Sequence, residues 1–273
     1  MHENGATGAA APYRELGDGV RMPMLGLGAW QSPAGAVTEH AVEWALEAGY
    51  RHIDTAQMYR NERSVGAALA RSSVPRGEVF VTTKWIPMAN RGVGELEHSL
   101  ERLGVAYVDL YLIHWPVPGR TGAAWRDLEQ AKERGLARTI GVSNYGSDRM
   151  EKFASARSRP AVNQVYFSPF HYRRRLLEAC ERLGVVLEAY SPLEQGGREL
   201  EHPTITGIAS RLERSPAQVM LRWGIQRGTV VIPKSSRRER IVSNAELFDF
   251  ELSDADMAAL DGLDRTGGTG RAR

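Results

Sequence analysis

Residues 49–62 have the sequence GYRHIDTAQMYRNE. The short apolar segment around Ile53 predicts a strand that ends at Asp54, and the polar residues after it predict a turn that carries Tyr59. A helical pattern follows from Ser64 onward. This stretch therefore predicts one strand–turn–helix unit, with a carboxylate at the end of the strand and a phenol on the turn.

The same alternation continues over the whole chain of 273 residues. Short segments rich in Val, Ile and Leu alternate with longer segments of helical periodicity, which is typical of βα units around a parallel sheet. Glycine follows several helical segments, as at Gly49 and Gly104, and is common where helices end. Eight such units predict an α/β fold, a (β/α)8 TIM barrel formed by a single domain of residues 1–273.

The predicted strands are Met24–Leu27, His52–Asp54, Val79–Thr83, Val108–Ile113, Thr139–Val142, Ala161–Val165, Val185–Ala189 and Val230–Ile232. The predicted helices are Val37–Ala48, Ser64–Arg71, Gly94–Leu103, Ala123–Arg134, Asp148–Ala156, Arg174–Leu183, Ser215–Gln226 and Arg237–Asn244. Together they account for most of the chain between residues 24 and 244.

Segments outside the eight units complete the predicted fold. Gly17-Asp18-Gly19 lies between two short strand patterns and predicts an N-terminal β-hairpin that could plug the bottom of the barrel. Glu251–Leu260 predicts an extra C-terminal helix. Residues 1–12 and 265–273 are small and polar, and we expect them to be flexible tails.

A doubly wound dinucleotide-binding fold is the main alternative architecture. Its fingerprint requires three glycines at the first strand-to-helix turn and an acidic residue about 20 positions later. Residues 26–31 lack the third glycine, and no acidic residue suited to bind a ribose follows at that distance. The barrel is therefore the favoured prediction.

The composition limits the expected partners and compartment. The net charge is +2, from 35 basic and 33 acidic residues without a basic block, so nucleic-acid binding is not indicated. No apolar segment approaches the ~20 residues that span a bilayer, so we expect no membrane attachment. Cys180 is the only cysteine and cannot form an internal disulfide, which favours a reducing compartment. We expect a cytoplasmic monomer that acts on a small molecule.

Lys84 and His114 also follow directly on predicted strands. Active sites of TIM barrels lie at the carboxyl ends of the strands, so both residues are expected near Asp54 and Tyr59. An ammonium group lowers the pKa of a nearby phenol from its usual ~10. We therefore expect Lys84 to make Tyr59 acidic and Asp54 to keep Lys84 charged. Tyr59 would then act as a general acid, and His114 would orient the reacting oxygen.

A metal-dependent hydrolase is an alternative use of the same strand ends. His52, Asp54 and His114 have side chains that bind metal ions on barrel strands. No other strand end supplies a histidine. We therefore predict no metal site.

The chain resembles the aldo-keto reductases over nearly its whole length. Residues 22–30 (MPMLGLGAW) resemble the family's opening strand, and residues 49–62 resemble the signature with its catalytic aspartate and tyrosine. TTKW at 82–85 and LIHWP at 112–116 resemble the segments with its catalytic lysine and histidine. The resemblance implies an NADPH-dependent oxidoreductase that reduces aldehydes and ketones, with Tyr59 as general acid. A non-enzymatic NADP-binding subunit is the alternative, and the complete set of four residues argues against it.

The resemblance also implies cofactor contacts. Ser143, Asn144 and Gln164 match residues that hold the nicotinamide carboxamide, and Tyr190 matches the tyrosine that stacks on the nicotinamide ring. Basic side chains after the last strand match contacts to the 2′-phosphate of NADPH, where an arginine fork suits phosphate. The expected cofactor-binding residues are Ser143, Asn144, Gln164, Tyr190, Ser191, Leu193, Lys234, Ser235 and Arg240, with Asn244 at the adenine.

The chain departs from the family's pattern in two places. Ser243 stands where glutamate is common, and we expect a looser hold on the adenine. Residues 165–169 (VYFSP), with Tyr166, replace a segment that often has glutamate and a later histidine, and we expect altered contacts near the cofactor.

Three tryptophans follow predicted strand ends. We expect Trp30, Trp85 and Trp115 to wall the substrate pocket with apolar surface, which favours carbonyl compounds of some hydrophobicity. The segment after Asp264 is short, which predicts an open pocket and broad substrate tolerance. Among family members, the chain is most similar to short bacterial ones such as the diketogluconate reductases.

Overall fold

A computed structural model describes residues 11–88 and 91–272 of the chain. Eight parallel strands follow one another around a barrel in the order in which they occur along the chain. Backbone hydrogen bonds from Gly26 to Val231 and from Val231 to Met24 join the two ends of the sheet and close it. The predicted (β/α)8 barrel is confirmed. Its strands are β3 (Leu27–Gly28), β4 (His52–Asp54), β5 (Phe80–Trp85), β6 (Val108–Ile113), β7 (Ala137–Ser143), β8 (Val162–Tyr166), β9 (Val186–Tyr190) and β10 (Val230–Ile232).

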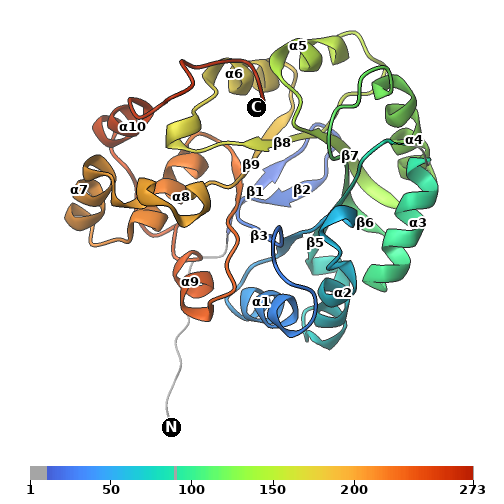
Figure 1. The fold of residues 1–273 in the computed structure, drawn as a ribbon, viewed down its shortest axis with the longest axis horizontal. Coiled ribbons are helices and arrows are strands. Elements are labelled where there is room, and N and C mark those ends of the chain that lie inside the picture. The colour runs from blue at the N-terminus through green and yellow to red at the C-terminus, as the bar shows by residue number, and fades with distance from the viewer. Residues whose placement is uncertain (1–10, 89–90, 273) are drawn as a thin grey trace.

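Helices surround the strands on the outside of the barrel (Figure 1). None of the helices in the described residues is long and apolar enough to cross a membrane. The helices are α1 (Ala36–Glu47), α2 (Glu62–Arg71), α3 (Gly92–Leu103), α4 (Thr121–Glu133), α5 (Ser147–Met150), α6 (Arg174–Arg182), α7 (Pro203–Arg211), α8 (Pro216–Gln226), α9 (Arg238–Ser243) and α10 (Asp254–Asp261).

The predicted hairpin forms and covers one end of the barrel (Figure 1). It consists of β1 (Tyr13–Glu15) and β2 (Arg21–Pro23), which pair antiparallel. Leu16 and Met22 from this hairpin are buried in a cluster with Leu110, Val162 and other strand residues. The hairpin therefore places apolar side chains under the barrel interior, as the expected plug.

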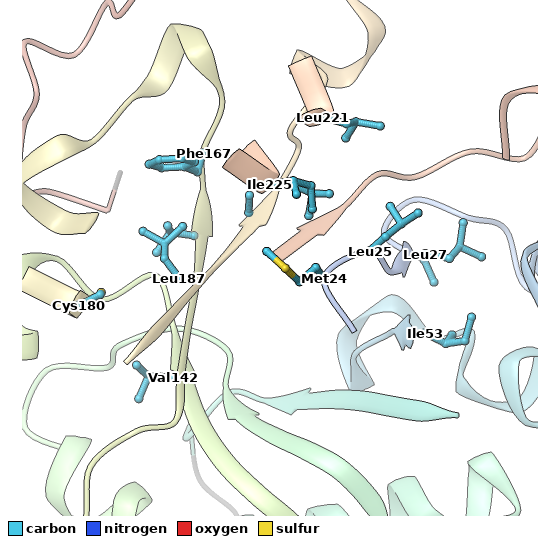
Figure 2. Packing of buried hydrophobic residues seen from close by; sticks show 14 of the residues in the cluster. Met24, Leu25, Leu27, Ile53, Val142, Phe167, Cys180, Leu187, Leu221 and Ile225 are labelled. Atoms are coloured by element: carbon cyan, nitrogen blue, oxygen red, sulfur yellow. The ribbon is translucent and has the colours of Figure 1, made fainter. Parts of the chain in front are cut away.

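A second, larger cluster fills the layer between strands and helices. Side chains of a strand alternate between its two faces, so every second residue of a barrel strand points outward. Ile53, Val142 and Leu187 belong to this cluster together with Leu221 and Ile225 of α8 (Figure 2). The remaining strand residues point into the barrel, where Asp54 and Lys84 are buried.

Several element boundaries differ from the prediction. β3 is shorter than Met24–Leu27 because the backbone of residues 24–26 bonds to Val231 rather than to the neighbouring β4. The helix expected over 148–156 ends at Met150 and continues as a 3-10 turn. α7 was not predicted; Pro203 begins it, and the His202 side chain accepts a hydrogen bond from its first turn.

The C-terminal segment is packed, which corrects the expectation of a flexible tail over 265–273. The backbone oxygen of Gly270 accepts a hydrogen bond from the Ser147 amide at 2.7 Å. The backbone oxygen of Arg271 accepts one from Arg173 Nη1 at 2.6 Å, and Ala272 is buried. Of the two expected tails, residues 1–10 and residue 273 lie outside the described residues.

Replacing Gly66 of α2 with alanine is expected to destabilise the fold. The added Cβ would lie 2.3 Å from the backbone oxygen of Leu103, where α2 meets α3. Overpacking of this kind costs about 1–3 kcal/mol. Urea unfolding followed by circular dichroism measures the change.

Gly207→Ala in α7 is the matched control, because its Cβ would meet nothing within 4 Å. Replacing a glycine inside a helix by alanine stabilises by about 0.5–1 kcal/mol. If Gly66→Ala also stabilised the protein, the close contact with Leu103 would not limit this position.

Candidate active site

Lys84 lies inside the barrel with three hydrogen-bond acceptors around its ammonium group. Its Nζ donates to Asp54 Oδ1 at 2.6 Å, to the Thr55 backbone oxygen at 2.9 Å and to the Tyr59 hydroxyl at 3.3 Å. An ammonium group has three protons, so these contacts use all of them. Because the Tyr59 oxygen is the acceptor, the hydroxyl proton of Tyr59 points elsewhere. Tyr59 lines a cavity at the carboxyl ends of the strands, and that proton is available to it.

The barrel's geometry brings these groups together. Asp54 ends β4, and Lys84 lies near the end of the adjacent β5. Both side chains point inward, and both are almost completely buried. Tyr59 belongs to a 3-10 turn over Gln57–Tyr59 that ends at Arg60, whose φ of 58° is in the left-handed region.

Asn61 fixes this turn to the rest of the structure. Its Oδ1 accepts a hydrogen bond from Thr55 Oγ1 at 2.7 Å. Its Nδ2 donates to the backbone oxygens of Ala29 and Ser32 at 2.9 and 3.1 Å. Asn61 directly precedes α2, but its side chain makes no cap for that helix. It holds the Tyr59 turn against the loop after β3.

Asp54 and Lys84 form a buried ion pair. Burial opposes the charge on Lys84, but the nearby charge of Asp54 raises the pKa of Lys84 overall. Burial raises the pKa of Asp54, against the attraction of Lys84 and the hydrogen bond from Gln164. The expectation that Asp54 keeps Lys84 charged agrees with these contacts.

The pKa of Tyr59 differs from the expectation. Burial raises it to about 12, and the attraction of Lys84 opposes this rise without reversing it. The extent of burial, which the sequence does not reveal, outweighs the charge of Lys84. Tyr59 is therefore fully protonated at neutral pH, as a proton donor must be. Lys84 is the group that would stabilise the phenolate once the proton leaves.

His114 lies beside Tyr59 and is neutral. The two rings are 5.5 Å apart between centroids in an edge-to-face arrangement. Burial, with a contribution from the positive charge of Lys84, lowers the pKa of His114 to about 3. A neutral imidazole can donate a hydrogen bond without carrying charge. His114 can therefore orient an oxygen atom in the cavity, as the sequence suggests.

The predicted nicotinamide residues are linked to these four by hydrogen bonds. Asn144 Nδ2 donates to the His114 backbone oxygen at 2.9 Å, and the Tyr190 hydroxyl donates to Asn144 Oδ1 at 2.9 Å. Ser143 Oγ donates to the Gln164 backbone oxygen at 2.8 Å. Gln164 Nε2 donates to Asp54 Oδ2 at 2.8 Å. Strands β4 to β9 therefore contribute to one connected polar site.

One cavity of about 710 Å³ connects this site to the loops after β9 and β10. A cavity of this size accommodates a drug-sized or larger ligand. All predicted cofactor residues and all predicted catalytic residues except Lys84 line this cavity. Lys84 is buried beneath the lining and contacts it through its hydrogen bond to Tyr59. The predicted residues that line it are Asp54, Tyr59, His114, Ser143, Asn144, Gln164, Tyr190, Ser191, Leu193, Lys234, Ser235, Arg240 and Asn244, together with Trp30 and Trp115.

Trp85 does not line this cavity, which corrects the prediction of a substrate-pocket wall. β5 extends to Trp85, two residues beyond its predicted end. Because Lys84 points into the barrel, alternation points Trp85 outward. Its side chain is buried among the helices and lies close to Gly92 at the start of α3. Trp30, by contrast, is 39% exposed at the mouth of the cavity.

The structure adds residues that sequence reasoning did not assign. Met58 is half exposed at the cavity mouth beside Tyr59. Gln195 and Glu239 also line the cavity. Glu188 is completely buried in the barrel interior and accepts a hydrogen bond from Gln164. A charged residue in the otherwise apolar segment 185–189 is the sequence signal for Glu188.

Both segments that depart from the pattern of the family lie at or next to the cavity. Ser243 lines the cavity, and its backbone oxygen accepts a hydrogen bond from Gln218. The Tyr166 hydroxyl donates to Glu194 Oε2 at 2.5 Å. Glu194 also accepts hydrogen bonds from Ser168 and His171. The replaced segment therefore contacts the loop after β9, which lines the cavity.

The strand ends do not assemble a set of metal ligands. Within residues 11–88 and 91–272, no three His, Cys, Asp or Glu side chains are grouped so that they could hold a metal ion. Asp54 instead bonds to Lys84 and Gln164.

Residues 24–265 match the sequence model of the aldo/keto reductase family. A 9,11-endoperoxide prostaglandin H2 reductase of Trypanosoma cruzi is 45% identical over 255 residues, which cover 91% of this chain and 90% of that protein. A glyoxal reductase of Bacillus subtilis is 43% identical over 256 residues, which cover 92% of each. The crystal structure of a Bombyx mori aldo-keto reductase in complex with NADP superposes with a TM-score of 0.85 at 36% identity, over 93% of each chain. The chain therefore belongs to the aldo/keto reductase family.

Proposed function

We propose that this protein reduces aldehydes and ketones to alcohols with NADPH as hydride donor and Tyr59 as general acid. The hydrogen bonds of Lys84 carry the proposal, because they leave the proton of Tyr59 available to the cavity. The relatives support the reaction class, since two proteins that are 43% and 45% identical are named as reductases of glyoxal and of a prostaglandin endoperoxide.

Groups at both ends of the cavity fit NADPH. Near Tyr59, the amides of Asn144 and Gln164 would hold the carboxamide, with Ser143, and the Tyr190 ring would cover the nicotinamide. At the other end, Lys234 and Arg240 line the cavity, and neither makes an ion pair within the described part of the chain. Free cations beside a hydroxyl group suit a phosphate. These two residues and Ser235 would hold the 2′-phosphate, with Asn244 at the adenine and Ser191 and Leu193 between.

The protein's own groups supply the proton and position the substrate. NADPH would supply the hydride that reaches the carbonyl carbon. Tyr59 donates its proton to the carbonyl oxygen, which completes the alcohol. Lys84, held in its charged form by Asp54, stabilises the phenolate that remains. His114 donates a hydrogen bond to the carbonyl oxygen and aligns the carbonyl group.

Apolar side chains at the cavity mouth favour substrates with some hydrophobic surface. Trp30, Met58 and Trp115 line the mouth beside Tyr59. The packed C-terminal segment lies against α5 and α6 and contributes nothing to the lining of this cavity. The pocket would therefore admit carbonyl compounds of varied size.

Tyr59→Phe is expected to remove reductase activity and leave NADPH binding intact. Loss of a general acid lowers kcat by about 10²–10⁴-fold, because the alkoxide then has no positioned proton donor. NADPH oxidation with a panel of aldehydes and ketones measures turnover, and fluorescence titration measures the Kd of NADPH.

Tyr13→Phe on the exposed hairpin is the control and should behave as wild type. Near-normal turnover of Tyr59→Phe would refute the general-acid assignment. A wild-type protein that binds NADPH but reduces no carbonyl compound would instead be a binding protein.

Arg240→Ala is expected to weaken NADPH binding much more than NADH binding. A lost hydrogen bond to a charged group costs about 1.5–3 kcal/mol, or roughly 10–100-fold in Kd. NADH has no 2′-phosphate, so its affinity should change little. Arg238→Ala is the matched control on the same helix, because its side chain pairs with Glu47 and does not line the cavity. Equal losses for both cofactors would show that Arg240 does not contact the phosphate.

The pH profile of carbonyl reduction should show no titration of His114 between pH 5 and 8. With its pKa lowered to about 3, His114 is neutral throughout that range. The wild type is therefore expected to show no acidic limb from His114 in that range, and His114→Gln should have a lower kcat/KM with a pH profile of the same shape. An acidic limb near the ordinary histidine pKa of ~6.5 that disappears in His114→Gln would show that His114 is charged in the working enzyme.

A further inference from the structure

Glu188 is a buried carboxyl group that the proposed reaction does not use directly. It lies in the middle of β9 and has no solvent exposure. It is paired in register with Gln164 on β8, and both side chains point into the barrel below the cavity. A buried carboxyl group loses hydration and is retained at a cost unless its contacts compensate.

Among the described residues, Gln164 makes the hydrogen bond to the Glu188 carboxyl group. Gln164 Nε2 donates to Glu188 Oε2 at 2.9 Å. His52 Nε2 lies 3.5 Å from Glu188 Oε1, but burial lowers the pKa of His52 to about 3, so the contact is not an ion pair. Glu188 Oε1 has no hydrogen-bond partner among the described residues. The barrel therefore gains little stability from this carboxyl group.

Gln164 is held by two carboxyl groups at once. Its Nε2 donates one proton to Asp54 Oδ2 at 2.8 Å and the other to Glu188 Oε2. An amide nitrogen has two protons, so both are used, and a reversed amide would place its oxygen against the Asp54 carboxylate. The carbonyl oxygen of Gln164 is consequently directed toward the cavity that Gln164 lines.

We infer that Glu188 is a positioning residue that acts through Gln164. It fixes the Gln164 amide so that its oxygen is presented to the carboxamide N–H of the nicotinamide, an inference that rests on the proposed function. With Asp54 alone, one amide proton would lack an acceptor and the side chain could rotate. A second acceptor holds the amide in one orientation before the cofactor binds, so that binding does not have to offset the entropy of ordering this side chain.

The charges around Glu188 agree with this role. The titratable groups that face it are Asp54, Lys84 and His52. Burial, together with the nearby charge of Asp54, raises the pKa of Glu188 to about 8. At neutral pH it is mostly protonated and still accepts the hydrogen bond from Gln164. It therefore orients Gln164 without adding a full negative charge beside the Asp54–Lys84 pair.

Glu188→Met and Glu188→Gln test the inference in the full-length protein. Methionine keeps the approximate length of the side chain but its sulfur is only a weak acceptor, whereas the amide oxygen of glutamine accepts a normal hydrogen bond. Glu188→Met should bind NADPH about tenfold more weakly, which corresponds to one lost positioning hydrogen bond. Glu188→Gln should remain within about twofold of wild type. The Kd is measured by fluorescence titration, and the melting temperature is measured on the same samples.

A double-mutant cycle with Gln164→Ala separates positioning from general support of the barrel. If Glu188 acts through Gln164, Glu188→Met should weaken NADPH binding no further in the Gln164→Ala background. An equal loss in both backgrounds would overturn the inference. So would wild-type affinity in Glu188→Met, a loss in Glu188→Gln as large as in Glu188→Met, or failure of Glu188→Met to fold. Absence of NADPH binding by the wild type would refute the proposed function instead.

Discussion

The active end of this barrel depends on one buried ammonium group. A charge inside a protein is tolerated only when its lost hydration is replaced, and an ammonium group needs three acceptors for that. Lys84 finds them in a carboxylate, a backbone carbonyl and a phenol. Each acceptor comes from a different part of the fold: Asp54 from the end of β4, Thr55 from the residue after that strand, and Tyr59 from the 3-10 turn. Satisfying this one ion therefore fixes the positions of the groups that the proposed reaction uses.

The barrel interior has a polar layer toward the carboxyl ends of the strands and an apolar layer at the end that the hairpin covers. Leu16 and Met22 of the hairpin close the lower end with apolar side chains. The polar groups that lie above them are connected through Gln164, which links Asp54 to Glu188. Exclusion of water strengthens every electrostatic contact in this layer, including the attraction between Lys84 and a phenolate. The same exclusion explains why burial raises the pKa of Tyr59.

The sequence was sufficient to predict the barrel and the cluster of Asp54, Tyr59, Lys84 and His114, because strand periodicity and strand ends are local properties. It was insufficient where the end of a strand differed by two residues from the prediction. β5 continues to Trp85, so that side chain points outward rather than into the cavity. α7 has only a short apolar face, Ile205, Ile208 and Ala209, and gave little periodic signal. The pairing of Glu188 with Gln164 depends on the register between β8 and β9, which no single segment contains.

The closure of the sheet also determines when the cavity can exist. The seam joins Leu25 to Val231, roughly two hundred residues apart along the chain. The backbones pack closely at Gly28, since a Cβ at this position would lie 2.8 Å from the Ile232 backbone oxygen. Contacts between such distant residues form late, because a long loop must be closed before they can be made. During synthesis, the chain can therefore assemble most of its βα units before it has a complete cavity, and that step must wait for β10.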